Sequence, residues 1–338
     1  TSSLWILTAN SFMQHPVGYT IRHGRAEMSN FWALLGNPQL RLELSHVLVG
    51  ALMTGGAIIA GLAAWQLLKK GKMNAVAKEF YRKTMKISLI LALIGSVSTM
   101  AIGDQQMIDL NKAQPMKFAA MEALYQDTGQ HGQWTAVGYS DPKTHELKYN
   151  IDIPDMLTLL TYHKTTGKVY GMKHANQVMR QKYGVKNSYY PPVNTLFWSF
   201  RVMCAVSAWV ALFSIIGLFA VRKKDPWIFR KRWLQWVLAI TTFFPFLANT
   251  AGWLIAELGR YPFTVYGMFT IADSVSPDVS ATSLLISNIV YFCLFATLGA
   301  VMVSLVRRQL KAGPDWEGDK KYKGEKGYGY DPFSKEAF

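Results

Sequence analysis

Five long apolar runs constrain the fold of this chain more than any other feature of its sequence. Each run lacks Asp, Glu, Lys, Arg and His, and each is close to the roughly 20 residues that a helix needs to cross a bilayer. Helices of a soluble protein would carry charged side chains on their solvent faces. The sequence therefore predicts an all-α integral membrane protein, a polytopic bundle of transmembrane helices. The runs are 47–68, 87–103, 202–221, 233–256 and 283–306.

The N-terminal stretch TSSLWILTANSFM is also apolar. The chain opens on Thr and carries no basic residue before this stretch, so we interpret it as the end of a truncated helix and not as a signal peptide. The predicted architecture has five full spans and one partial span.

Basic residues are concentrated in alternate connections between the apolar runs. Segments 69–86 and 222–232 are rich in Lys and Arg, and three more basic residues follow the last run. The positive-inside rule places these segments in the cytoplasm. The net charge of +15 is then a signal of topology and not of a nucleic-acid-binding patch, so no nucleic-acid partner is predicted. The segments predicted to lie outside are 14–41, 104–193 and 257–282.

The predicted organisation has four parts. Residues 1–103 form the partial helix and two spans, 104–193 a long outer segment, 194–306 three spans, and 307–338 a mobile cytoplasmic tail. Two pieces of the outer segment, QPMKFAAMEALYQD and MKHANQVMRQKYG, have helix-favouring residues. A long outer segment can act as a lid or binding loop, and the alternative is an irregular solvated loop.

Of the seven histidines, only His46 belongs to a predicted spanning helix. An ionisable group at membrane depth is a candidate for function, and a neutral imidazole is a good iron ligand. Met203 lies at a similar depth on another helix, so the two side chains could hold one haem from both faces. Arg201 could bind haem propionates. The alternatives are core packing for His46 and Met203, and snorkelling to the interface for Arg201.

Glu257 and Arg260 lie at the outer end of the fourth run. Glu257 could pair with Arg260, ligate a metal or relay protons. Cys204 and Cys293 lie inside apolar runs without a CxxC motif, so the sequence supports neither covalent c-type haem nor a zinc site.

Four short motifs follow one another along the chain: WILTANSFMQHPVGY, QPMKFAAMEALY, FRVM and AGWLIAELGRYPF. In this order they resemble segments of subunit I of cytochrome bd, a bacterial quinol oxidase. GRYPF departs from the GRQPW of that family. The first three helices of the family have no counterpart here, and they carry the ligand of haem d. The resemblance therefore implies a truncated chain that is not active alone.

The resemblance also implies a set of haem-binding residues. His46 and Met203 would be the axial ligands of the low-spin haem b558, with Arg201 stabilising that haem. Glu257 would ligate the high-spin haem b595, and Trp253 would lie between haems.

Further roles follow from the same resemblance. Arg260 would bind propionates, and Asn10 and Ser2 would lie beside the haem d site and its proton path. Lys173 matches the lysine of the family's quinol loop, although no Glu follows it shortly. Lys173 and Glu257 are the predicted catalytic residues.

The implied function is that of a terminal oxidase in the bacterial inner membrane. Quinol would be oxidised at the periplasmic side, and electrons would pass through haem b558 and haem b595 to haem d, where dioxygen becomes water. This reaction would generate proton-motive force without pumping. The implied partners are subunit II, a small single-helix subunit, quinol, dioxygen and membrane lipid. The alternatives are a membrane cytochrome b that only relays electrons, and a transporter or channel.

Overall fold

The computed structural model describes residues 2–69, 75–184, 188–222, 226–276 and 278–312. The chain divides into two compact units, of which the first comprises 1–68 and 84–275 and the second 69–83 and 276–338. Most of the predicted cytoplasmic tail, 313–338, lies outside the described residues. The site discussed below belongs entirely to the first unit.

The predicted helical membrane fold is confirmed, because the described residues include five helical segments that are long and apolar enough to cross a membrane. The N-terminal stretch is also helical, as α1 (Ser2–Gln14). The candidate spans are α3 (Pro38–Lys69), α4 (Ala75–Ala113), α8 (Val193–Val221), α9 (Arg232–Thr241) together with α10 (Phe244–Leu258), and α11 (Ala281–Ala312).

The run 233–256, which the sequence predicts as one span, is divided between α9 and α10. Pro245 lies in the first turn of α10. Proline has no backbone N–H and its ring crowds the preceding turn, so a helix begins at this residue more easily than it passes through it. The end of α9 is held against α8 by a hydrogen bond from Trp209 Nε1 to Thr241 Oγ1 at 3.0 Å.

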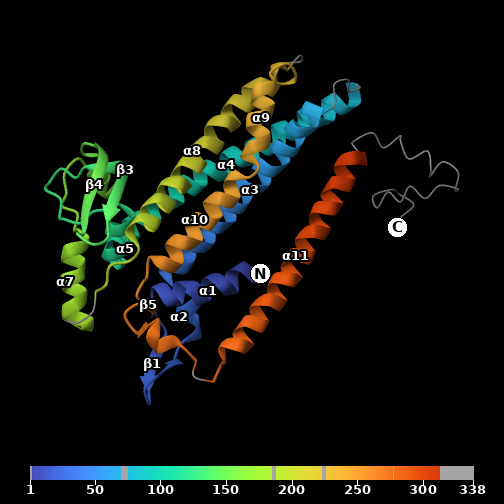
Figure 1. The fold of residues 1–338 in the computed structure, drawn as a ribbon. Coiled ribbons are helices and arrows are strands. Elements are labelled where there is room, and N and C mark those ends of the chain that lie inside the picture. The colour runs from blue at the N-terminus through green and yellow to red at the C-terminus, as the bar shows by residue number, and fades with distance from the viewer. Residues whose placement is uncertain (1, 70–74, 185–187, 223–225, 277, 313–338) are drawn as a thin grey trace. The chain divides into compact units, whose positions relative to one another are not determined.

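Helices α3 and α4 approach each other closely at two glycines. A Cβ on Gly95 would lie 2.4 Å from Met53 N, and a Cβ on Gly56 would lie 2.5 Å from Ala92 N. Only glycine allows such an approach, as is common between helices in membranes. Figure 1 shows these helices beside α8 and α10. The four helices share a buried cluster of Met53, Ala92, Val206, Val210 and Ala248.

The outer segment 104–193 is folded, which decides against the irregular loop. Helix α4 continues into it as far as Ala113. Helices α5 and α7 fall in the two pieces with helix-favouring residues, whereas the antiparallel β3–β4 hairpin has no counterpart among the sequence-based predictions. The elements are α5 (Pro115–Met121), β3 (Trp134–Asp141), β4 (Glu146–Ile153), α6 (Met156–Tyr162) and α7 (Met172–Tyr183).

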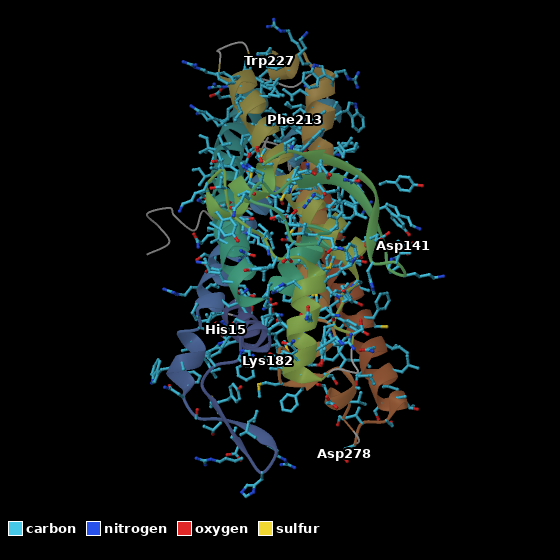
Figure 2. The ribbon with its side chains drawn as sticks, turned by 90° about the vertical axis from the view of Figure 1, so that its left-hand side faces the viewer. His15, Asp141, Lys182, Phe213, Trp227 and Asp278 are labelled. Atoms are coloured by element: carbon cyan, nitrogen blue, oxygen red, sulfur yellow. The ribbon has the colours of Figure 1, made fainter. Side chains whose placement is uncertain are left out.

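A hydrophobic core joins the outer segment to the ends of α8 and α10. Figure 2 shows Lys182, on α7 of this segment, far from Trp227 at the opposite end of α8 and α9. The buried side chains of this core include Phe118, Leu157, Met172, Tyr189, Leu196, Ile255 and Phe263. The outer segment is therefore packed onto the helices that carry the predicted site residues.

The remaining elements are short. The described strands of the first unit form two-stranded sheets. These elements are β1 (Tyr19–Arg22), β2 (Arg25–Met28), α2 (Phe31–Leu35), η1 (Trp227–Phe229), β5 (Phe263–Val265), β6 (Phe269–Thr270) and η2 (Ala272–Ser274).

Candidate functional site

The two predicted axial ligands lie on different helices, and each has a glycine beside it. The Nδ1 atom of His46, on α3, is buried and has no hydrogen-bond partner among the described residues. A Cβ on Gly103 of α4 would lie 3.5 Å from His46 Cε1, and a Cβ on Gly252 of α10 would lie 3.2 Å from Met203 Sδ. An imidazole with a free nitrogen and a thioether, each next to a position without a side chain, fit iron ligation.

Glu257, at the end of α10, accepts hydrogen bonds from two other predicted site residues. Asn10 Nδ2 on α1 donates to Oε1 at 3.0 Å, and Arg260 donates to Oε2. The Glu257 side chain is 44% exposed, whereas that of Arg260 is 7% exposed. One guanidinium nitrogen of Arg260 has no partner in the described part of the chain. The carboxylate is thus open to a metal, and the spare guanidinium nitrogen suits an anionic group such as a propionate.

Three polar residues that the sequence did not single out extend this cluster. Gln14 Nε2 donates to Asn10 Oδ1 at 2.6 Å and to Glu43 Oε1 at 2.7 Å. Lys117 Nζ donates to Gln14 Oε1 at 2.7 Å. Burial lowers the pKa of Lys117 to about 8, and the charge of Glu43 opposes this shift. A lysine among the buried apolar residues of α5 is a visible signal in the sequence, but its partners are not.

Trp253 lies one turn before Glu257 on α10, and its side chain is 47% exposed. Its place between haems remains a prediction. No group of three or more His, Cys, Asp and Glu residues is arranged to hold a metal ion within the described ranges. An iron porphyrin needs only one or two axial donors from the protein, so isolated donors such as His46 and Met203 suffice for it.

Arg201 forms a buried ion pair and does not snorkel to water. Its guanidinium donates to Glu122 Oε2 at 2.8 Å, and the two side chains are 8% and 4% exposed. It also donates to the backbone oxygen of Thr135 and lies 4.4 Å from the ring centroid of Trp134. Burial raises the pKa of Glu122, and the charge of Arg201 opposes this shift. The predicted contact between Arg201 and a haem remains a prediction.

We expect Glu122→Ala to destabilise the protein by about 3 to 5 kcal/mol, because it leaves the Arg201 guanidinium buried without its counter-charge. Glu122→Gln keeps an oxygen acceptor and should cost less. Thermal unfolding of the purified protein measures both. Glu27→Ala is a suitable control, because Glu27 makes an exposed ion pair and surface pairs contribute little. An alanine variant as stable as this control would contradict a structural role for the buried pair.

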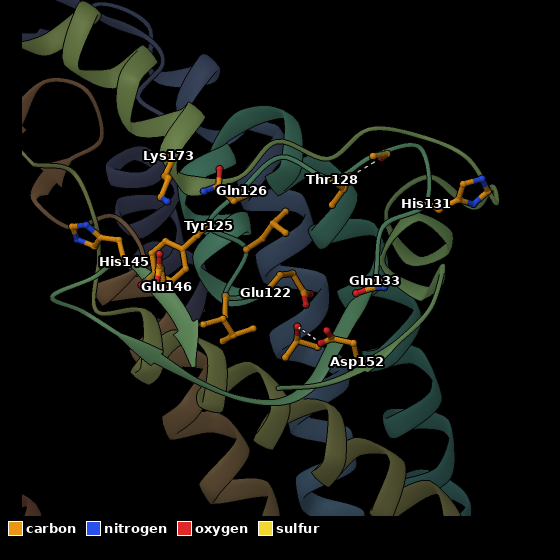
Figure 3. A pocket seen from close by; sticks show the side chains of 15 residues that line it. Glu122, Tyr125, Gln126, Thr128, His131, Gln133, His145, Glu146, Asp152 and Lys173 are labelled. Carbon is orange, nitrogen blue, oxygen red and sulfur yellow. Dashed lines mark hydrogen bonds between the residues drawn. The ribbon is translucent and has the colours of Figure 1, made fainter. Parts of the chain in front are cut away.

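A cavity of about 540 Å³ lies in the outer segment and includes Glu122 and Thr135 in its lining. Lys173, from the first turn of α7, also lines this cavity, and Figure 3 shows it near Tyr125. The backbone N–H of Lys173 donates to the carbonyl of Tyr125 at 3.0 Å. The predicted quinol-loop lysine therefore lines the same cavity as Glu122 and Thr135, which both accept hydrogen bonds from Arg201. Arg201 precedes Met203 by two residues on α8.

These features define a helical membrane protein in which the predicted iron donors His46 and Met203 lie on the same helical bundle onto which the folded segment 104–193 packs, an arrangement expected of a membrane cytochrome. The family model described as cytochrome bd terminal oxidase subunit I matches residues 1–314. The chain belongs to this family.

Individual relatives agree with this assignment. The chain is 42% identical over 337 residues to cytochrome bd ubiquinol oxidase subunit 1 of Bacillus subtilis, covering 100% of this chain and 69% of the relative. It is 25% identical to cytochrome bd-II ubiquinol oxidase subunit 1 of Escherichia coli, covering 90% and 68%. The fold matches a bd oxidase structure from Geobacillus thermodenitrificans with a TM-score of 0.72 and 24% identity, covering 91% of this chain and 67% of that one.

Several predictions made from the sequence are confirmed by the family. The chain is a multi-pass inner-membrane protein and a subunit of an oxidoreductase, the cytochrome bd terminal oxidase. Membership of this family implies bound haem and a second subunit in the complex. The roles of individual residues, the haem types and the sidedness of the membrane remain proposals.

Proposed function

We propose that this chain is the quinol-oxidising, haem-carrying subunit of a bd-type oxidase that reduces dioxygen to water. The relatives named above are described as ubiquinol oxidase subunits. The observation that carries the proposal is the cavity of the outer segment. Its lining residues Glu122 and Thr135 bond to Arg201, and Arg201 lies on the same helix as the predicted ligand Met203. A substrate in this cavity is therefore held next to the helix that holds the electron acceptor.

The cavity supplies the groups that a quinol requires. A quinol has a planar ring with two hydroxyl groups, and it must lose two protons when it loses two electrons. Lys173 provides a cation, and Glu122 provides a carboxyl group able to accept a hydrogen bond. Figure 3 shows Lys173 and His131 toward opposite ends of the cavity, so both ends carry polar groups. The protons leave on the side of the outer segment.

The haems would be held by residues whose surroundings fit that task. His46 and Met203 are the proposed axial ligands of haem b558, and Glu257 that of haem b595, while haem d is the proposed oxygen-reducing group. When bound, the haems supply the electron transfer and the dioxygen chemistry. Asn10 and Arg260 fix both carboxylate oxygens of Glu257, and the free nitrogen of Arg260 would neutralise a propionate.

The proposed orientation places the outer segment in the periplasm and the C-terminus in the cytoplasm, because the basic connections lie on the other side. Protons released outside and taken up from inside generate proton-motive force without pumping. A small single-helix subunit is a further proposed partner.

The complete oxidase, purified from membranes, should consume oxygen when a short-chain quinol such as decylubiquinol is added. Anaerobic reduced samples should show a carbon monoxide difference spectrum, because the oxidase, unlike the two alternatives, has a haem with an open coordination position for this gas. A cytochrome that merely relays electrons lacks this spectrum, and a transporter or channel lacks haem colour altogether. The absence of the carbon monoxide spectrum, or of haem colour, would overturn the proposal.

Lys173→Ala should raise the KM for quinol about tenfold while leaving the haem spectrum unchanged, since hydrogen bonds to charged groups contribute on this scale. Oxygen uptake at varied quinol concentration measures the change. Lys182→Ala is the matched control, because Lys182 lies at the other end of α7 over the ring of Tyr183. An unchanged KM in the Lys173 variant would remove this residue from the site.

A further inference from the structure

The turn between β3 and β4 places a histidine ring on the wall of the same cavity. His145 lines the cavity, and its ring stacks on Tyr190 with centroids 4.1 Å apart and planes 18° apart. The ring of Tyr125, which also lines the cavity, lies 6.1 Å from that of His145. Three aromatic rings therefore gather where the hairpin meets the start of α8.

The backbone of His145 is in the left-handed region, with φ of +54°. Glycine adopts this conformation most readily, and Asn, Asp and His are the commonest other residues there, at a cost of about 1 kcal/mol or more. A turn that needs only to close would be better served by glycine. The stacking on Tyr190 holds the His145 ring in place. The position of His145 in the cavity lining suggests a role in binding a ligand.

The aromatic group is fixed to the bundle and does not move with a free loop. Tyr125 and Ser140 share a short hydrogen bond between their hydroxyl groups. Asn194, in the first turn of α8, donates to the carbonyl of Ser140 at 2.7 Å and accepts from its N–H at 2.8 Å. At the other end of β3, Thr135 is bonded to Arg201. Strand β3 is thus attached to α8 at two points.

We propose that His145 binds the quinol ring in this cavity, stacking on its face and hydrogen-bonding one of its hydroxyl groups. The inference rests on the proposed function and extends it from the charged groups of the cavity to its aromatic wall. Aromatic rings prefer stacked contacts with other planar rings, and an imidazole nitrogen accepts a hydrogen bond from a hydroxyl group. His145 combines both properties on one side chain, whereas Lys173 provides a charge and hydrogen-bond donors but no ring.

His145→Gly tests the proposal, because glycine suits the left-handed turn and removes only the ring. We expect the KM for decylubiquinol to rise about three- to tenfold, as loss of an aromatic contact predicts. The turnover at saturating quinol and the haem spectrum should match those of the wild type. The melting temperature should not fall below the wild-type value. His145→Phe keeps the stacking and loses the nitrogen, so its KM should lie between those of the wild type and the glycine variant.

His23→Gly is the matched control, since His23 also occupies a hairpin turn with positive φ but does not line the cavity. Its KM should not change. A normal KM in both His145 variants, alongside a raised KM in Lys173→Ala, would overturn the role of His145 and leave the proposed function standing. A wild-type oxidase that consumes no oxygen with quinol would overturn both. If the glycine variant lost haem, the phenylalanine variant would decide: a normal KM there refutes hydrogen bonding by His145, and a raised KM supports it.

Discussion

Glu257→Ala is expected to remove the high-spin haem selectively and to lower quinol-dependent oxygen consumption by about 100-fold or more. Changes to residues that only support a metal ligand cost about 10- to 100-fold, and loss of the proposed ligand itself should exceed that. The substitution also leaves Asn10 and the buried Arg260 without their shared acceptor. The haem content of the purified oxidase and its reduced-minus-oxidised spectrum measure the effect.

Two companion variants separate ligation from general damage. Glu257→Gln retains an oxygen for Asn10 but loses the negative charge, so it should lose the haem while unfolding at a higher temperature than Glu257→Ala. Glu27→Ala removes an exposed carboxylate and should change neither haem content nor activity. Normal haem content in Glu257→Ala would count decisively against the ligand role.

If Met203 is the proposed axial ligand, Met203→Leu should convert the proposed haem b558 from six-coordinate to five-coordinate and shift its reduced spectrum to a high-spin form. Leucine is close in volume to methionine, so the packing cost should stay below about 1.5 kcal/mol, but it has no donor atom. The thioether contributes the raised potential of a His/Met-ligated haem, so electron transfer from quinol should slow as well. Optical spectra of the reduced enzyme at low temperature measure the spin state.

Met85→Leu is the matched control, because Met85 on α4 is completely buried and has no proposed contact with a haem. It should leave the spectrum unchanged. An unchanged spectrum in Met203→Leu would show that Met203 is not a haem ligand, and the second axial ligand opposite His46 would have to be another residue.

The candidate site divides into a part that the sequence predicted and a part that it missed. Asn10, Glu257 and Arg260 were all singled out from sequence motifs, and the structure joins them by hydrogen bonds. Lys117 and Glu122 were not singled out, although they lie within one of the quoted motifs. Their significance comes from burial against partners 103 and 79 positions away, and no local pattern records such pairing.

The sequence did not predict the lining of the cavity either. Its walls combine the end of α5, a hairpin with two irregularities in register, and the first turn of α7. Short strands in a polar segment give a weak periodic signal, whereas the helix-favouring composition of α5 and α7 gave a usable one.

The sequence by itself determined the membrane-spanning helices, because a bilayer imposes the same length and lack of charge on every span and each span meets that demand locally. It also determined the family, through short motifs in a fixed order. Only the tertiary structure decided which acid neutralises Arg201 and that His145 stacks on Tyr190. These outcomes depend on contacts between distant segments, whose free energy exists only once the helices and the outer segment have packed together.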